Sequence, residues 1–317
     1  MNLVFFGNND RGIVCLEELV ARGYSIPLVV AHPDAIPVKQ KSVKATAERM
    51  GIRVIQPANV NNPDVVRQIA QVATEDDIFV LAGYGQIIKQ EILGLPRKAC
   101  LNLHGGKLPQ YRGSSPINWM ILNGESEGGI SIIEVDHGID TGDILAQRFF
   151  EIGIDDDAAS IQAKTLKLFP AMLDSTLQAV QAGTATRIRQ ARNEGSYYPV
   201  RTPADGLILW DQMTAWQVYN LVRALVKPFP GAFSYIDRAK VYVWRARLME
   251  EQIIGIPGRI YGVRDGGVVV MCQDRCIMLE TLQMEGGEVV PASQIIQRRG
   301  GNFATARDVL LAMDRVQ

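Results

Sequence analysis

The sequence predicts an α/β protein, in which a parallel sheet with helices on both faces is followed by a small β-barrel. Short apolar runs alternate with helical patterns through the first half of the chain, which is typical of a parallel sheet. The run Ile78–Ala82 is apolar at every position, as strands buried on both faces require. Beyond about residue 203 the pattern changes to short apolar runs separated by Gly and Pro, which indicates a barrel.

Hydrophobic spacing orders the elements of the first half of the chain. Apolar residues that recur every three or four positions predict a helix, and short apolar runs bounded by turn residues predict strands. The expected order is a strand at Leu3–Phe6, a helix with Ile13, Leu16, Leu19 and Val20 on one face, a strand at Ile26–Val30, a helix at Ala45–Met50, a strand at Ile52–Ile55, a helix at Val65–Ala70, and strands at Ile78–Ala82, Lys98–Leu103 and Ile130–Ile133. We assign residues 1–190 to this domain.

A polar stretch with Gly and Pro separates the two halves, and we interpret residues 191–203 as a linker. One amphipathic helix follows at about Ala215–Leu225. The apolar runs after it predict strands at Ala232–Ile236, Lys240–Ala246, Gly258–Val263, Val268–Cys272 and Cys276–Leu282, the last two joined by a hairpin turn. Residues 204–317 are therefore expected to form a second, barrel-like domain.

Composition and charge exclude several classes of protein. The 317 residues are 47% hydrophobic and 21% charged, as in an ordinary soluble protein, and no run approaches the ~18 apolar residues of a membrane helix. The opening segment lacks the pattern of a signal peptide, so we expect a cytoplasmic protein with no membrane partner. Four scattered cysteines predict free thiols, and no set of Cys and His completes a metal site. The net charge of −1 predicts no general attraction to nucleic acid.

Two polar side chains stand at the end of a predicted strand. Asn102 and His104 are two residues apart, so they should project from the same face of that strand. They also stand at its carboxyl end, where open parallel sheets bind ligands. An imidazole beside an amide donor can hydrogen-bond a carbonyl oxygen and move a proton near pH 7. The alternative is that both side chains only satisfy backbone groups at the strand end.

An acidic segment with two glycines spans residues 134–143, directly after a predicted strand, and holds Asp140 between Gly138 and Gly142. Glycines permit backbone shapes that hold a carboxylate in a tight turn facing a pocket, from which Asp140 could orient His104. The alternatives are a solvated hairpin turn or an Asp that caps a helix. A calcium loop is disfavoured, because the acidic spacing does not follow the EF-hand order.

The turn after the first strand could bind an anion. It lies between Gly7 and Gly12, so its backbone amides and the following helix N-terminus could hold a phosphate. The turn lacks the Gly-x-Gly-x-x-Gly pattern of dinucleotide-binding proteins, which argues against a nicotinamide dehydrogenase. The alternative is an ordinary turn with Asp10 as the helix N-cap.

Three motifs together resemble the folate-dependent formyltransferase family. They are Asn102-Leu103-His104-Gly105, Leu108-Pro109-Gln110-Tyr111-Arg112-Gly113 and Asp140-Thr141-Gly142. The family shows Asn-x-His, a Leu-Pro-x-Tyr/Trp-Arg-Gly loop and an Asp-x-Gly carboxylate, in this order, on a Rossmann-like domain. The resemblance covers residues 1 to about 190, and the tail resembles the C-terminal OB-like barrel of methionyl-tRNA and amino-sugar formyltransferases.

The resemblance implies a co-substrate and a catalytic trio. The co-substrate is 10-formyltetrahydrofolate, whose formyl group passes to an amine. Asn102 and His104 are implied to stabilise the oxyanion that forms, and His104 to move protons while Asp140 holds or charges it. The co-substrate is implied to lie against residues of three segments, namely Gln86, Ile87, Ile88, Leu108, Asp136, His137, Gly138 and Ile139.

The acceptor implied by the closest resemblance is the amine of a nucleotide-linked amino sugar. The run from Ser115 to Glu125 is closest to the domain that acts on UDP-4-amino-4-deoxy-arabinose, and the near-neutral tail argues against a tRNA-binding surface. We therefore expect a role in lipopolysaccharide or O-antigen biosynthesis, and no nucleic-acid partner. The candidate substrate contacts are Asn8, Asn9, Arg11, Tyr111, Arg112 and Arg201.

Several alternatives stay open. Gly106-Lys107 stands where relatives often carry Ser-Leu, and Ser114 stands where the arabinose enzyme has Arg, so contacts made by this loop are undecided. The main alternative function is methionyl-tRNA formyltransferase, followed by formyltetrahydrofolate hydrolase, which could use the same trio. A cofactor-free binding module would require the three aligned polar residues to be a coincidence. Relatives suggest a homodimer, and no metal is expected.

Overall fold

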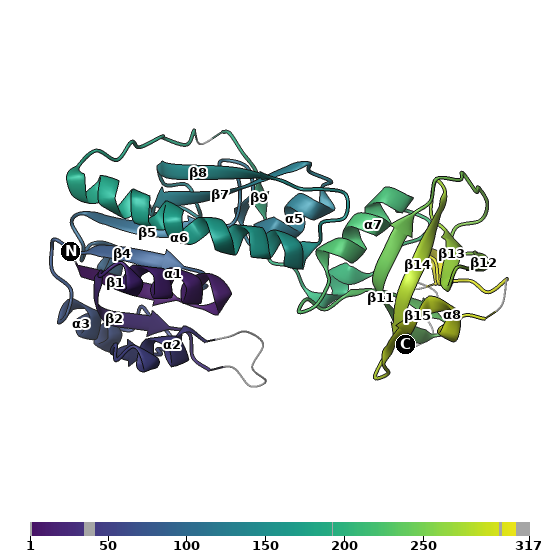
Figure 1. Ribbon diagram of the computed structural model, residues 1–317, viewed down its shortest axis with the longest axis horizontal. Coiled ribbons are helices and arrows are strands. Elements are labelled where there is room, and N and C mark those ends of the chain that lie inside the picture. Colours follow the sequence, from purple (N-terminus) through teal and green to yellow (C-terminus); the bar gives the residue numbers. More distant parts are fainter. Residues whose placement is uncertain (1, 35–41, 192, 298–299, 309–317) are drawn as a thin grey trace. The chain divides into compact units, whose positions relative to one another are not determined.

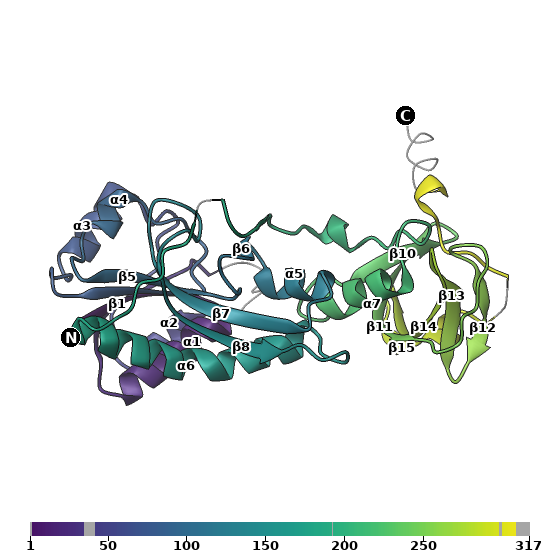
Figure 2. The ribbon, with the colours of Figure 1, turned by 90° about the horizontal axis from the view of Figure 1, so that it is seen from above.

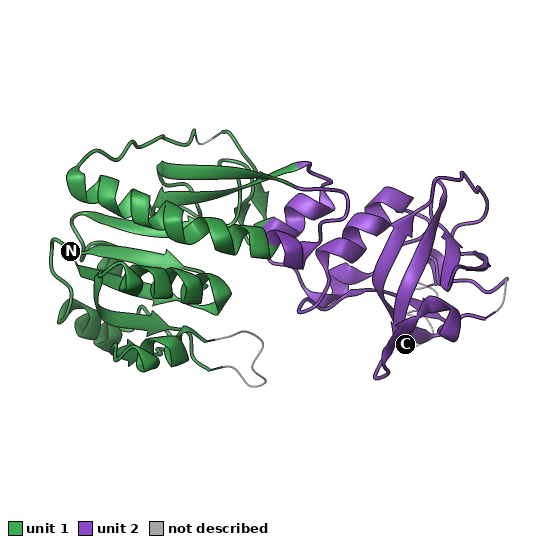
Figure 3. Ribbon diagram, in the orientation of Figure 1, with its two compact units in different colours: residues 1–116, 127–151, 162–199 green, residues 117–126, 152–161, 200–317 purple. Residues whose placement is uncertain are grey.

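The structure is a computed structural model that describes residues 2–34, 42–191, 193–297 and 300–308. The chain divides into two compact units, each made of three segments (Figure 3). The first unit holds Met1–Pro116, Glu127–Glu151 and Gln162–Pro199, and the second holds Ile117–Ser126, Ile152–Ile161 and Val200–Gln317. Two short segments before residue 162 thus belong to the second unit, which no sequence pattern indicated. The division at a 191–203 linker stays a prediction.

The first unit is built on a seven-stranded sheet (Figure 1). Its strands, in spatial order, are β3 (Val54–Ile55), β2 (Ser25–Ala31), β1 (Asn2–Gly7), β4 (Ile78–Ala82), β5 (Ala99–His104), β7 (Glu127–Glu134) and β8 (Ile144–Glu151). The strands from β3 to β5 are parallel, whereas β7 and β8 are antiparallel to their neighbours. The predicted Rossmann-like sheet is confirmed, with an antiparallel pair at one edge that the sequence analysis did not anticipate.

Helices cover both faces of this sheet, as Figure 2 shows. On one face lie α1 (Asn9–Ala21), α2 (Val43–Arg49) and α6 (Ala158–Ala182), and on the other lie α3 (Pro63–Ala70) and α4 (Gln90–Leu93). Strand residues alternate between the two buried layers: Leu3 and Phe5 pack with the first set of helices, and Val4 and Phe6 with the second. No helix among the residues described here is long and apolar enough to cross a membrane.

The second unit carries an antiparallel sheet. Its strands, in spatial order, are β10 (Ala232–Ile236), β11 (Ala239–Leu248), β14 (Cys276–Met284), β13 (Gly267–Met271) and β12 (Ile260–Arg264), and β15 (Val289–Pro291) pairs with β14. Isolated bridges join Phe303 to Ile236 of β10 and Asn302 to Arg259, which directly precedes β12. One short segment thus connects the two edge strands of the sheet. The five predicted strands and the hairpin between Cys272 and Cys276 are confirmed.

Helices complete the core of the second unit. They are α5 (Pro116–Leu122, of which Pro116 belongs to the first unit), the short 3-10 helix η1 (Pro203–Gly206), α7 (Ala215–Ala224) and α8 (Ala292–Ile295). α7 begins where Thr214 and Gln217 cap each other's backbone amides. Its apolar face, with Val218 and Leu221, packs in one cluster with Trp210 and the sheet.

Candidate active site

Strand β5 ends at the carboxyl edge of the parallel strands and places Asn102 and His104 there. Both side chains approach one carboxylate. The Asn102 Nδ2 atom lies 3.3 Å from Asp140 Oδ1, and the His104 Nδ1 atom lies 3.5 Å from Asp140 Oδ2. The structure thus brings together the three residues that the sequence motifs singled out.

The connection between β7 and β8 returns to β5 and carries Asp140. Gly142 permits this course, because a Cβ atom there would lie only 1.7 Å from the carbonyl oxygen of Glu134. Asp140 itself has a φ of 54°, in the left-handed region. Its Oδ2 accepts a hydrogen bond of 2.9 Å from the backbone N–H of Gly113. With its side chain only 13% exposed, Asp140 is not part of a solvated acidic turn.

The His104 imidazole is buried and has a neighbour at each ring nitrogen. Its Nε2 lies 2.6 Å from the carbonyl oxygen of Tyr111. Because a carbonyl oxygen can only accept, Nε2 carries the ring proton of the neutral form, and Nδ1 presents its lone pair on the side of Asp140. Burial lowers the pKa of His104, and the nearby Asp140 carboxylate counteracts this only in part. The ring is therefore neutral at pH 7.

A pair of short strands holds the Tyr111 carbonyl in place. β6 (Arg112–Gly113) pairs in parallel with β9 (Tyr197–Tyr198), and Tyr111 stacks on Tyr198 with ring centroids 4.9 Å apart. Tyr111 has a φ of 64°, which turns its carbonyl group toward the imidazole. Residues far apart in the sequence thus fix the acceptor of His104.

Gln190 is a residue that the sequence analysis missed. Its side chain is buried, with Nε2 donating to the carbonyl oxygens of Asp140 at 3.0 Å and Gly142 at 2.7 Å. Its Oε1 accepts from Nε and Nη2 of Arg112, at 3.0 and 2.8 Å. Arg112 also donates to the Glu194 carbonyl and is 1% exposed. Arg112, predicted as a substrate contact, is thus engaged with protein groups, and substrate contact by it stays a prediction.

The residues implied to bind the co-substrate lie in the loops that follow β4, β5 and β7. Gln86 is turned toward the protein, since it accepts from the Val60 amide and donates to the Pro57 carbonyl. Ile88 and Leu108 are buried, and Asp136 accepts hydrogen bonds from Gly138 and Thr141 of its own turn. His137 and Gly138 are exposed, as are Ile87 at 73% and Ile139 at 58%. Exposed isoleucines and loop backbone groups fit a flat heteroaromatic ring, which needs apolar contacts and a few hydrogen bonds.

The remaining candidate substrate contacts divide between the two units. Asn8 holds the N-cap position of α1, and Asn9, with a φ of 54°, accepts from the Arg11 amide. The Arg11 guanidinium donates to the Leu103 carbonyl at 2.8 Å, which places it beside the strand end that carries His104. Arg201 belongs to the second unit, where it lies over the Trp119 ring and donates to the Asp205 carbonyl.

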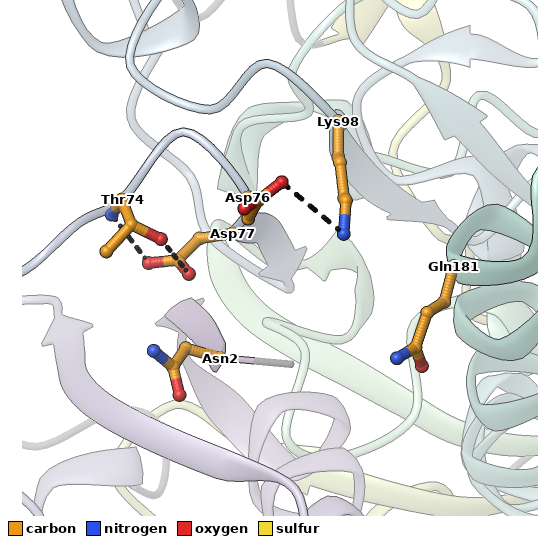
Figure 4. Close-up of a pocket in the computed structure, with 6 residues that line it drawn as sticks. All are labelled: Asn2, Thr74, Asp76, Asp77, Lys98 and Gln181. Atoms are coloured by element: carbon orange, nitrogen blue, oxygen red, sulfur yellow. Dashed lines mark hydrogen bonds and ion pairs between the residues drawn. The ribbon is translucent and has the colours of Figure 1, made fainter.

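A polar pocket at the amino ends of β1, β4 and β5 has a different character (Figure 4). It encloses about 250 Å³ and is lined by Asn2, Thr74, Asp76, Asp77, Lys98 and Gln181. Its polar groups bond to one another, Asp77 to Thr74 and Asp76 to Lys98. In the described part of the chain, no three His, Cys, Asp or Glu side chains gather in a way that could hold a metal ion.

Two family models match the chain. Residues 1–177 match the formyl transferase model, and residues 201–300 match the model of the formyl transferase C-terminal domain. The chain belongs to the formyltransferase family. It is a folate-dependent formyl transfer enzyme with 10-formyltetrahydrofolate as its co-substrate, as the motifs implied.

Relatives along nearly the whole chain carry one activity in their names. The methionyl-tRNA formyltransferase of Geobacter metallireducens is 36% identical over 93% of this chain and 95% of its own length. That of Ruminiclostridium cellulolyticum is 37% identical over 96% of this chain and 98% of its own length.

Solved structures with lower identity share the fold. An N-formyltransferase from Helicobacter canadensis, in complex with folinic acid and dTDP-3-aminofucose, matches with a TM-score of 0.68 at 20% identity, over 87% of this chain and 98% of its own. HypX from Aquifex aeolicus matches with a TM-score of 0.64 at 20% identity, over 93% of this chain. The match spans 48% of that longer protein.

The expected sugar-nucleotide acceptor and the expected absence of a nucleic-acid partner are wrong, because the full-length relatives are methionyl-tRNA formyltransferases. The run that suggested the sugar forms helix α5. Its Asn118 is buried and donates to the Ala224 carbonyl at 2.6 Å, so it serves packing within the second unit. The charge argument fails because net charge averages over the whole surface and says nothing about how charges are distributed on it.

Proposed function

We propose that this protein transfers the formyl group of 10-formyltetrahydrofolate to the amine of methionyl-tRNA, with Asn102, His104 and Asp140 as its catalytic residues. The proposal that methionyl-tRNA is the acceptor rests on sequence identities of 31–37% to methionyl-tRNA formyltransferases over at least 90% of both chains. The observation that supports the trio is its convergence at the carboxyl edge of the sheet.

His104 Nδ1 receives the proton of the attacking amine and would return it to the folate nitrogen when the bond between that nitrogen and the formyl carbon breaks, so that tetrahydrofolate leaves. Its Nε2 is committed as a donor to the Tyr111 carbonyl, so Nδ1 is the basic atom of the neutral ring. Burial keeps the imidazole neutral at pH 7, which is the form a general base needs. Asp140 Oδ2, 3.5 Å away, stabilises the imidazolium once the proton arrives.

Asn102 supplies an electrophilic donor. Its Nδ2 has two hydrogens, of which one points to Asp140 Oδ1. The other can donate to the formyl oxygen, where negative charge develops during attack. Asp140 therefore orients both partners: it accepts from the amide and faces the imidazole, while the Gly113 amide fixes its own position.

The co-substrate supplies the activated formyl group. The residues that would hold it lie in the loops after β4, β5 and β7, namely Gln86, Ile87, Ile88, Leu108, Asp136, His137, Gly138 and Ile139. Ile87 and Ile139 are the exposed apolar contacts among them, so they are expected to cover the ring faces. Among the candidate substrate contacts, Arg11 donates to the carbonyl of Leu103, the residue before His104, and its guanidinium is suited to a phosphodiester of the acceptor.

An acceptor competition tests the proposed function. The protein is incubated with 10-formyltetrahydrofolate, charged methionyl-tRNA and a panel of amino-sugar nucleotides, and each acceptor is analysed by mass spectrometry. We expect a mass increase of the methionyl group alone. Formylation of an amino sugar with none of methionyl-tRNA would overturn the proposal, and release of formate without any acceptor product would indicate a hydrolase.

A further inference from the structure

We infer that Gln190 and Arg112 are positioning residues of the formyl transfer reaction, acting through the backbone of the Asp140 loop. This inference rests on the proposed catalytic role of Asp140. The hydrogen bonds of these two side chains do not go to the His104 imidazole or to the Asn102 side-chain amide. Their contacts instead form a closed chain of hydrogen bonds that begins and ends on Asp140.

The chain of contacts starts with a single amide group. The two hydrogens of Gln190 Nε2 point to two carbonyl oxygens of the same loop, that of Asp140 at 3.0 Å and that of Gly142 at 2.7 Å. This bidentate contact pins the residues on both sides of Thr141. It fits a need of the backbone, because Asp140 adopts the left-handed conformation, which a non-glycine residue keeps only where its surroundings hold it.

Arg112 fixes the rotation of that amide. Its Nε and Nη2 both donate to Gln190 Oε1, so the amide cannot flip without placing its NH₂ group against two N–H donors. Arg112 is itself held by the Glu194 carbonyl and by the Tyr197 ring, 5.2 Å from the guanidinium carbon. With both side chains buried, an unmade hydrogen bond in this network is not replaced by water.

The backbone around Arg112 closes the circle. The next residue, Gly113, donates its N–H to Asp140 Oδ2, and the preceding residue, Tyr111, accepts from His104 Nε2. One tripeptide therefore sets the carboxylate, the imidazole and, through Gln190, the main chain that carries the carboxylate. A displacement of this loop would change the distance between Asp140 and His104, to which turnover is sensitive.

Two substitutions of Gln190 separate positioning from packing. Gln190→Ala removes the amide, whereas Gln190→Glu keeps an acceptor for Arg112 and loses both donors to the loop. We expect both variants to lower kcat about tenfold or more, while KM for methionyl-tRNA changes less than about threefold. In Gln190→Ala the acid limb of the pH–rate profile should also move to lower pH, because burial lowers the pKa of His104 and a displaced Asp140 would oppose this less, while the Tyr111 carbonyl also raises that pKa and Arg11 lowers it. A wild-type kcat in Gln190→Glu would overturn the inference. This test holds even if Gln190→Ala does not fold.

A matched control and a double variant complete the test. Gln283 of the second unit likewise accepts from one side-chain N–H, that of Trp244, and donates to a carbonyl, that of Gly287, so Gln283→Ala should leave kcat within about twofold of wild type. Gln190→Ala combined with Asp140→Asn should be no slower than Asp140→Asn alone, since both act through one carboxylate. Additive losses would overturn the inference. An active Asp140→Asn variant would instead overturn the proposed role of Asp140, which keeps the two failures distinct.

Discussion

The two ends of the sheet in the first unit both hold carboxylates beside a basic group, and they differ in how those groups are held. At the amino ends of the strands, Asp76 and Lys98 lie 3.7 Å apart with side chains 90% and 36% exposed (Figure 4). At the carboxyl edge, Asp140 and His104 are 13% and 6% exposed. Water screens the charges of the first pair, so their interaction is weak. Burial of the second pair strengthens the interaction between the carboxylate and the imidazole, so their geometry and protonation state matter more.

The sources of the hydrogen bonds differ as well. Asp77, at the amino end, accepts from the amide and hydroxyl of Thr74, which is a turn within one short segment. Asp140 accepts from Asn102 and Gly113, which come from separate parts of the chain. A pocket with polar walls is therefore weak evidence for a site, and convergence of distant segments on one buried carboxylate is stronger evidence.

The largest expected effect is the loss of the general base. His104→Ala should lower kcat by about 100- to 10,000-fold, because no other group takes the proton of the amine in this account. Steady-state formylation of methionyl-tRNA measures it, with circular dichroism as the check that the protein is folded. A folded His104→Ala variant with a kcat within tenfold of wild type would contradict the catalytic role that distinguishes the carboxyl edge from the amino edge.

Removal of the amide donor should have the next largest effect. Asn102→Ala deletes the hydrogen-bond donor to the formyl oxygen and should lower kcat by about 100-fold, with little change in KM, as for other oxyanion donors. Asn102→Asp sharpens the test, since it keeps size and removes donation. Equal activity of Asn102→Asp and wild type would rule out the donor role.

The pH dependence of turnover should follow the imidazole. Because burial lowers the pKa of His104, the acid limb of kcat/KM should have its midpoint below the ordinary value of about 6.5, with activity falling about tenfold per unit below it. The unfolded chain binds this proton at a higher pH than the folded chain does. The neutral imidazole therefore makes its full contribution to the free energy of unfolding above pH ~6.5, and this contribution is lost as the pH falls through the lowered pKa of His104. A midpoint above 7 in a pH–rate series would contradict the assignment.

A smaller effect is expected from the glycine that lets the loop return to β5. Gly142→Ala places a Cβ against the Glu134 carbonyl, so the loop must shift, at a cost of about 1–3 kcal/mol in the free energy of unfolding. We expect a severalfold lower kcat with it. Thermal unfolding and kinetics of Gly183→Ala, a glycine with open space around it at a φ of 70°, provide the comparison, in which kcat stays unchanged.

Sequence reasoning predicted the fold because its signals are local. Burial on both faces makes β4 apolar throughout, and the spacing of Asn102 and His104 follows from strand geometry alone. Helix α6 was not among the predicted helices, although its buried Phe169, Leu173 and Leu177 recur at helical spacing. The two early segments of the second unit had no local signal, because their partners are distant in the chain.

The site was predictable only in part for the same reason. Motif resemblance pointed to Asp140, but Gln190 lies in a polar stretch with no pattern of its own, and its role depends on contacts about 50 residues away. The acceptor was misjudged because the run that holds Asn118 resembled a sugar formyltransferase domain, whereas Asn118 is a buried hydrogen-bond donor to the Ala224 carbonyl. Polar residues in a helix do not reveal from sequence whether they face a ligand or the protein.

The most direct measurement applies the same chemical change to both edges. Asp140→Asn and Asp76→Asn each replace one carboxylate by an amide, and the rate of formylmethionyl-tRNA formation is measured for each at saturating 10-formyltetrahydrofolate. We expect a loss of about 100-fold or more for Asp140→Asn, and a rate within twofold of wild type for Asp76→Asn, whose exposed ion pair contributes little. Equal rates for the two variants would contradict a catalytic role of Asp140.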